Sequence, residues 1–360
     1  MGIIISDSIE QDSLNLISLY TDTDYTKKRI IKAYGGLKPQ RQTRVANLIK
    51  SFLDQANSFL LETDKNIFSA PLTLFYAINN YSKAVFYANI PNENIAGTHG
   101  IELADSDDEI EKISSLGDIK LKVNFKGAFS SLVKVTGDDL KANDVIQLKD
   151  IFSLVPELRE LYYARYAEEP NIFLLQPIGI KATSYEVYFQ SDDIDAINRR
   201  DFSLMLNNSL HFKVSKTYGY VICDGNTTEE RKRNAMYSDV FGNVYCTNGI
   251  SVNSRRIKIS KLVCLYICFY AFSMMVRYHP DNWKKFCDSV DVGIIKKLLI
   301  NCRREMLVEV LQLLSGENYS FATKIYPIED GLDGGEVLRV LKKELKQEKN
   351  MTGKNPLLNI

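Results

Sequence analysis

The segment from Leu262 to Val276, LVCLYICFYAFSMMV, constrains the fold more than any other part of the sequence. Its run of apolar residues is shorter than the roughly 18 residues that a helix needs to cross a bilayer. The run is also followed directly by Arg277, Tyr278, His279 and Pro280. The segment therefore predicts a helix buried at the centre of a globular protein, with no membrane span.

Two segments in the N-terminal third also predict helices. From Arg41 to Leu61, apolar residues recur every three or four positions, which is typical of a helix that buries one face. The next segment, 70–89, begins with Ala70-Pro71-Leu72, where proline suits the first helical turn. This second helix is apolar nearly all round, so we expect it to lie centrally. Its polar exceptions, which should cluster near one side, are Asn79, Asn80, Ser82 and Lys83.

The hydrophobic period changes after an acidic stretch at 105–111, which we interpret as a solvated connection. Apolar residues alternate with polar ones between Ile119 and Phe125, as in a half-buried strand. We expect the following FSSLVKV, residues 129–135, to form the second strand of a β-hairpin.

Helical and extended segments follow one another in the rest of the middle region. Residues 147–166 predict a short helix, a break at Pro156 and a second helix. Strands are expected within 171–177, 184–190, 210–215 and 218–224, and a helix is expected around 192–200.

Helices return from Lys261 onward, notably at 292–314, which stops before Gly316, and at 336–347. The fold class expected from this order is α+β and predominantly helical. We expect a helical region at 1–112, a mixed α/β or β-rich region at 113–258, and a second helical region at 259–360 that packs on the first.

The charge balance limits the classes of partner. Lysine plus arginine equals aspartate plus glutamate at 45 each, so no overall positive field attracts nucleic acid or anionic membrane. Any such binding must come from a local patch. Six cysteines occur in a chain whose first residues lack the basic and apolar pattern of a signal peptide, so we expect a reducing cytoplasm.

Four stretches together resemble the YaaC-like proteins of bacteria. In order they are APLTLFYAINNYSKAVFYAN, THGIEL, LKDIFSLVPELRELY and YAFSMMVRYHPDNW, spread over residues 70–283. None is a catalytic signature. The resemblance therefore names a family more clearly than a function.

The helix at 74–89 with the following His99-Gly100 also resembles the helical core of HEPN domains. This resemblance implies a HEPN-like helical core, dimerisation, and a role in a phage-defence or stress system. Catalytic HEPN ribonucleases resemble one another in an arginine followed, after four to six residues, by a histidine. Neither His99, His211 nor His279 follows an arginine at that spacing, so the motif is absent.

Two places carry candidate ligand-binding residues. Arg277 and His279 end the most apolar helix, where they would either grip a phosphate or cap the helix. His99 lies in the glycine-flanked turn AGTHGI, where its imidazole would serve acid-base chemistry or simply hold the turn. The candidate ligand-binding set is Asn80, Lys83, His99, Arg277 and His279, and no residue is assigned as catalytic.

The densest basic clusters lie in the middle region. They are Arg231, Lys232 and Arg233, and Arg255, Arg256 and Lys258. Such clusters are either ordinary solvated surface or, if they merge in space, a nucleic-acid-binding groove.

Other common sites are disfavoured by the sequence. Cys264 and Cys268 share a helix face, but no further short-spaced pair completes a zinc set, so we expect no metal and no cofactor. The sequence also lacks a Walker-type loop, a nucleophile elbow and a dinucleotide fingerprint.

The leading functional hypothesis is a non-catalytic module that binds a protein partner, a nucleic acid or a nucleotide, as a homo-oligomer or a subunit of a complex. The alternative is a HEPN-related nuclease or nucleotide-processing enzyme that lacks the usual motif. A structural subunit of a larger assembly is the third hypothesis.

Overall fold

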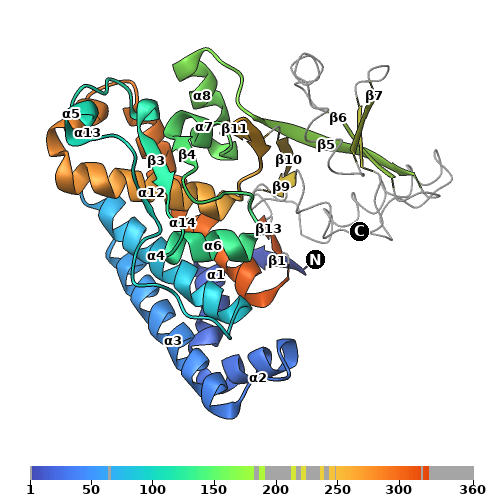
Figure 1. Cartoon of the computed structure of the whole chain (residues 1–360). Helices are drawn as coiled ribbons and strands as arrows, with labels where there is room; N and C mark the ends of the chain where they lie inside the picture. The colour runs from blue at the N-terminus through green and yellow to red at the C-terminus, as the bar shows by residue number, and fades with distance from the viewer. Residues whose placement is uncertain are drawn as a thin grey trace, which may run out of the picture. The chain divides into compact units, whose positions relative to one another are not determined.

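Helices predominate in the part of the chain that the structure describes (Figure 1). The computed structural model describes residues 2–63, 66–181, 186–190, 212–215, 220–223, 236–238, 243–247, 249–317 and 319–323. The strands within these ranges form small sheets with antiparallel pairing. The expected α+β, predominantly helical class is confirmed.

The helices are α1 (Ile9–Ser18), α2 (Thr23–Ala33), α3 (Pro39–Glu62), α4 (Ala70–Asn89), α5 (Asp107–Ile110), α6 (Ala128–Thr136), α7 (Leu148–Phe152), α8 (Arg159–Tyr166), α12 (Lys261–Tyr278), α13 (Pro280–Cys287) and α14 (Val292–Ser315). Short 3₁₀ turns are η1 (Leu19–Thr21), η2 (Leu116–Asp118) and η3 (Pro156–Leu158).

The strands are β1 (Gly2–Ser6), β2 (Ile101–Leu103), β3 (Lys120–Val123), β4 (Val145–Gln147), β5 (Ile172–Lys181), β6 (Glu186–Gln190), β7 (Phe212–Ser215), β8 (Tyr220–Cys223), β9 (Met236–Ser238), β10 (Val244–Thr247), β11 (Ile250–Val252), β12 (Arg255–Ile257) and β13 (Tyr319–Thr323). The larger sheets have the orders β7-β8-β6-β5-β10-β9 and β2-β3-β4.

The chain divides into two compact units. One contains Met1–Ile4 and Ser8–Phe321, and the other contains Ile5–Asp7 and Ala322–Ile360. The features described below belong to the first unit. The division into regions 1–112, 113–258 and 259–360 stays a prediction.

Helix α4 is buried on nearly every side, as its composition predicts. On one side it packs against α3 through stacked aromatic pairs, Phe59 with Tyr76 at 5.1 Å and Phe52 with Tyr87 at 6.0 Å between ring centroids. Because the later residue of α3 meets the earlier residue of α4, the two helices are antiparallel. Aromatic pairs of this kind stabilise a fold by more than their buried area accounts for, so they help to hold α3 and α4 together.

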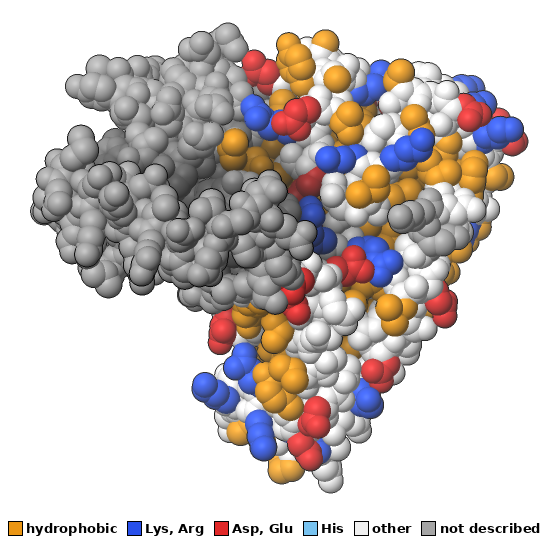
Figure 2. All heavy atoms as spheres, turned by 180° about the vertical axis from the view of Figure 1, so that it is seen from behind, with side chains coloured by type: hydrophobic (Ala, Val, Ile, Leu, Met, Phe, Trp, Pro, Cys, Tyr) orange, Lys and Arg blue, Asp and Glu red, His pale blue; other side chains and the backbone are white. Residues whose placement is uncertain are grey.

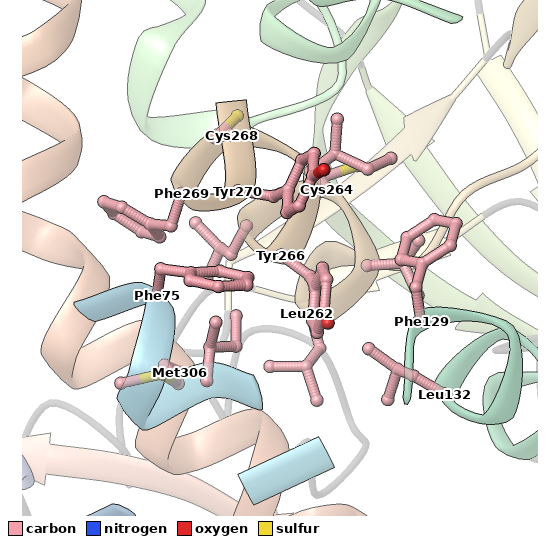
Figure 3. Close-up of a cluster of buried hydrophobic side chains, with 14 of the residues drawn as sticks. Phe75, Phe129, Leu132, Leu262, Cys264, Tyr266, Cys268, Phe269, Tyr270 and Met306 are labelled. Atoms are coloured by element: carbon pink, nitrogen blue, oxygen red, sulfur yellow. The ribbon is translucent and has the colours of Figure 1, made fainter. Parts of the chain in front are cut away.

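Helix α12 lies against another side of α4, and these two apolar helices share a buried cluster (Figure 3). The Tyr266 hydroxyl donates to Asn79 Oδ1 at 2.9 Å, and the Phe75 ring meets the edges of Tyr266 and Tyr270 at 5.8 and 5.4 Å. Phe129 and Leu132 of α6 and Met306 of α14 join the cluster. Shared burial of large side chains holds these four helices together.

Helix α12 is long and apolar enough to span a membrane, but 78% of its apolar window is buried inside the protein. A mostly buried helix of this kind is typical of a protein core. The predicted burial of the segment Leu262–Val276 is therefore confirmed.

The β-hairpin expected from residues 119–135 is wrong. Its first half forms β3, but FSSLVKV lies in helix α6, and β3 pairs with β2 and β4. Phe129, Leu132 and Val133 are spaced to bury one helical face. Glycines at both ends, Gly127 before the helix and left-handed Gly137 after it, set its limits.

The other expectations for the middle and C-terminal regions are mostly met. The helix, the break at Pro156 and the second helix occur as α7, η3 and α8, and strands β5 to β8 occupy the four expected stretches. Within the acidic connection, α5 forms behind a Ser106–Glu109 capping box. The expected helices at 192–200 and 336–347 lie outside the described residues.

Candidate functional site

His99 sits on a turn that the start of α6 holds in place. The carbonyls of Thr98 and His99 accept hydrogen bonds from the N–H groups of Ala128 at 3.0 Å and Phe129 at 2.8 Å. Thr98 Oγ1 also donates to the Lys126 carbonyl at 2.9 Å. The turn thereby satisfies backbone donors that a helix start leaves free, so its position is coupled to α6.

Two glycines allow the His99 turn to lie this close to the start of α6. Gly100 has φ +81° and Gly127 has φ +136°, both in the region that side chains disfavour. A Cβ atom on Gly127 would lie 2.6 Å from Gly100 Cα and 2.7 Å from the Thr98 carbonyl oxygen. Only glycine lets the two backbones come this close.

The imidazole of His99 packs against two aromatic rings. Its ring centroid lies 5.2 Å from that of Phe75 on α4 and 6.0 Å from that of Tyr270 on α12. The residue nevertheless remains exposed to solvent. The α4–α12 contact thus supports an imidazole that solvent can reach.

Two cations share this site with His99. Burial is the main cause that lowers the pKa of His99 below its ordinary value, and the positive charges of Arg277 and Lys83 lower it further. The imidazole is therefore neutral at pH 7 and has a ring nitrogen that can accept a proton. We call Lys83, His99 and Arg277 the His99 cluster.

The two cations make no ion pair within the described part of the chain. Lys83 is half-buried with its ammonium 5.4 Å from the Phe52 ring centroid, and this burial lowers its pKa. The Arg277 guanidinium donates to the Ser273 carbonyl at 3.2 Å and lies 5.1 Å from the Tyr278 ring centroid. Partly buried charges without a counter-charge are costly, and an anionic ligand would offset that cost.

The other two candidate ligand-binding residues have local partners. Asn80 is buried and donates from Nδ2 to the Tyr76 carbonyl at 3.0 Å, one turn earlier in α4. His279 lies between α12 and α13, with Nε2 3.6 Å from Asp107 Oδ1. These contacts fit packing and capping, so the structure groups Lys83, His99 and Arg277 and leaves Asn80 and His279 with structural contacts.

The candidate nucleic-acid-binding residues fall into two groups. Arg231, Lys232 and Arg233 lie outside the described residues, so their merging with the second cluster stays a prediction. In the second cluster, the Arg255 guanidinium binds both carboxylate oxygens of Asp144, at 2.6 and 2.8 Å.

The rest of the second cluster is also only partly open to a ligand. Lys258 is half-buried, and burial lowers its pKa to about 8, although the negative charges of Asp138 and Glu309 oppose this shift. Arg256 is exposed. On the face in Figure 2, positive and negative side chains are interspersed over the described residues, so no continuous basic surface is seen there.

Sequence reasoning missed a buried charge cluster around Lys261. Its ammonium lies 2.7 Å from Glu305 Oε2, 3.9 Å from Glu309 Oε1 and 4.0 Å from Glu157 Oε1. The signal was present as a lysine that opens the most apolar helix and two glutamates on one face of α14. Within the described residues, no group of His, Cys, Asp and Glu side chains is arranged to hold a metal ion.

The Lys261 cluster predicts a pH-dependent stability. Burial raises the pKa of Glu157 from 4.5 to about 7, Lys261 opposes this shift, and the neighbouring Glu305 adds to it. The folded pKa exceeds the unfolded one, so this contribution to stability is present below pH 4.5 and is lost as pH rises through 7. We expect it to amount to about 3 kcal/mol.

Denaturant unfolding at several pH values checks this expectation. The Glu157→Gln variant should lose most of the decline in stability that the wild type shows between pH 5 and 8. Parallel pH curves for the two proteins would show that Glu157 is not the titrating group.

The chain was also compared with known proteins. No curated protein matches it, and no solved structure matches it. The resemblance to HEPN domains therefore stays a prediction. The family model of the YaaC-like proteins matches residues 16–314, which is most of the chain, and the chain therefore belongs to the YaaC-like family.

Proposed function

We propose that this protein is a binding module whose His99 cluster holds a phosphate-bearing ligand, either a nucleotide or a nucleic acid. The observation that supports the proposal most is the grouping of two cations, unpaired within the described residues, around a fixed, neutral imidazole. Phosphate oxygens accept charge-assisted hydrogen bonds from lysine and arginine.

The surroundings of the site favour a bound anion. Lys83 and Arg277 both act on His99 as positive charges, so each would attract an anion bound at the imidazole. The turn that carries His99 is fixed by backbone hydrogen bonds to α6. A fixed site loses little conformational entropy on binding, which favours affinity.

The proposal is tested by Lys83→Met and Arg277→Met. Each change removes one charge and keeps an apolar stem, and we expect each to weaken binding of a labelled oligonucleotide about tenfold. Each should also reduce the dependence of affinity on salt, because fewer counterions are released on binding.

Lys50→Met is the matched control for these two variants. Lys50 is an exposed lysine on α3, paired with Asp54 at 3.2 Å, and we expect its replacement to leave affinity unchanged. Thermal unfolding of all three variants checks that they remain folded. Equal affinities for wild type, Lys83→Met and Arg277→Met would rule out the His99 cluster as the binding site.

A nuclease or nucleotide-processing activity is the second candidate. A neutral imidazole can act as a general base, and the two cations beside it can stabilise the negative charge of a phosphate. His99→Gln should then abolish RNA cleavage while oligonucleotide binding persists. Absence of cleavage by the wild-type protein removes this candidate and leaves the binding module.

Assembly and cellular setting belong to the same proposal. We expect a homo-oligomer or a subunit of a complex within a phage-defence or stress system, as the HEPN resemblance implies. The cysteine usage favours a location in the cytoplasm. Native mass measurement of the purified protein tests assembly, and a strictly monomeric particle without a bound partner would contradict that part.

A further inference from the structure

By their positions along helices α4 and α12, Lys83, His99 and Arg277 follow one another in a row. The two helices are antiparallel, since Asn79 meets Tyr266 whereas the earlier Phe75 also meets the later Tyr270. The Trp283 indole, beyond the end of α12, donates to the Ile67 carbonyl, just before the start of α4. This contact agrees with the antiparallel arrangement.

This arrangement places the backbone positions of the two cations on opposite sides of Phe75 and Tyr270, which contact the imidazole. Lys83 lies two turns beyond Phe75 on α4, and Arg277 lies two turns beyond Tyr270 on α12. Because the helices run in opposite directions, the two backbone positions lie roughly 20 Å apart along the helix axes, at 1.5 Å per residue. A single phosphate is too small to engage all three groups, so the row suits an extended polyanion.

Exposed aromatic rings accompany the row. Tyr278 is 62% exposed, and the Arg277 guanidinium lies 5.1 Å from its ring centroid. Phe125 is 80% exposed and lies in the loop that holds the His99 turn, where the Asn124 N–H donates to the Gly100 carbonyl at 3.0 Å. Aromatic side chains open to solvent beside cations are typical of surfaces on which unpaired bases stack.

We infer that the ligand of the His99 cluster is a single-stranded nucleic acid. Its phosphates would lie along Lys83, His99 and Arg277, and its bases would stack on Tyr278 and Phe125. This inference rests on the proposed function and narrows its ligand. A duplex is disfavoured because its bases are already stacked and paired, so the two aromatic rings would gain no partner.

Three probes separate the inference from the proposed function. They are a labelled single-stranded oligonucleotide, the same sequence as a duplex, and inorganic polyphosphate, which has the charge but no bases. We expect the single strand to bind at least about tenfold more tightly than either other probe, through the gain from base stacking.

Variants of the two aromatic residues test base stacking directly. Tyr278→Ala and Phe125→Ala should each weaken single-strand binding about tenfold and leave polyphosphate binding unchanged. Tyr278→Phe keeps the ring and should bind like the wild type. Tyr163→Ala, which removes a 60% exposed tyrosine of α8, is the control and should have no effect.

The outcomes are distinguishable. Equal binding of single strand, duplex and polyphosphate, with no effect of Tyr278→Ala or Phe125→Ala, would overturn the inference and leave the proposed function standing. Failure of all three probes to bind would overturn both.

Discussion

Replacing Lys261 with methionine is expected to lower the free energy of unfolding by about 3–5 kcal/mol. The lysine ammonium is the shared partner of Glu157, Glu305 and Glu309, and the side chain of Glu305 is only 2% exposed. Removing the ammonium leaves the three carboxylates facing each other, with Arg304, 3.2 Å from Glu305 Oε1, as the remaining cation beside them. Urea unfolding at pH 7, followed by circular dichroism, measures the loss.

Two further variants show that the loss comes from uncompensated charge. Adding Glu305→Leu to Lys261→Met removes the most buried carboxylate and should recover part of the stability. Lys27→Met breaks only a 3.5 Å pair with Asp24, whose side chain is 81% exposed, and should change stability by less than about 0.5 kcal/mol. A loss for Lys261→Met as small as that of Lys27→Met would refute the assigned role of the cluster.

Gly127→Ala is expected to have the second large effect, a loss of about 3 kcal/mol together with weaker ligand binding. The added Cβ would meet the backbone of Gly100 and of Thr98, and none of these atoms can rotate away. The His99 turn must then separate from the start of α6. Thermal unfolding and oligonucleotide affinity measure the two consequences.

Gly137→Ala is the matched control, because it isolates backbone strain from steric contact. Gly137 ends α6 at φ +71°, and a Cβ there would have nothing within 4 Å. Left-handed strain alone should cost about 1 kcal/mol and leave ligand binding unchanged. If both alanine variants lose the same stability, the close approach of Gly127 and Gly100 is unimportant.

The sequence predicts the helical core well because local pattern and burial agree there. Helices α12 and α4 are apolar on nearly every side, so both must be buried at the centre of the fold. There they pack on each other. Residues 129–135 were misread because valines and alternating polarity suit a strand as well as a helix. Tertiary contacts decide that these residues form a helix, because β3 pairs with β2 and β4 instead of with them.

The candidate site was predictable only in part. His99 and Arg277 stand out by residue type and by their place at a turn and a helix end. Their grouping with Lys83 depends on the antiparallel contact of α4 and α12, which no local pattern specifies. The pairing of Arg255 with Asp144 likewise joins residues far apart in sequence, so a basic cluster in the sequence proved to be partly internal.

The pKa of His99, measured by NMR titration of its imidazole, tests the central claim most directly. The chain has three histidines, so His99→Gln identifies the signal. In the free protein the pKa should lie below its ordinary value, because burial and the charges of Arg277 and Lys83 disfavour the imidazolium. A bound single-stranded oligonucleotide should raise this pKa through its phosphates. An ordinary pKa that the oligonucleotide leaves unchanged would contradict the account.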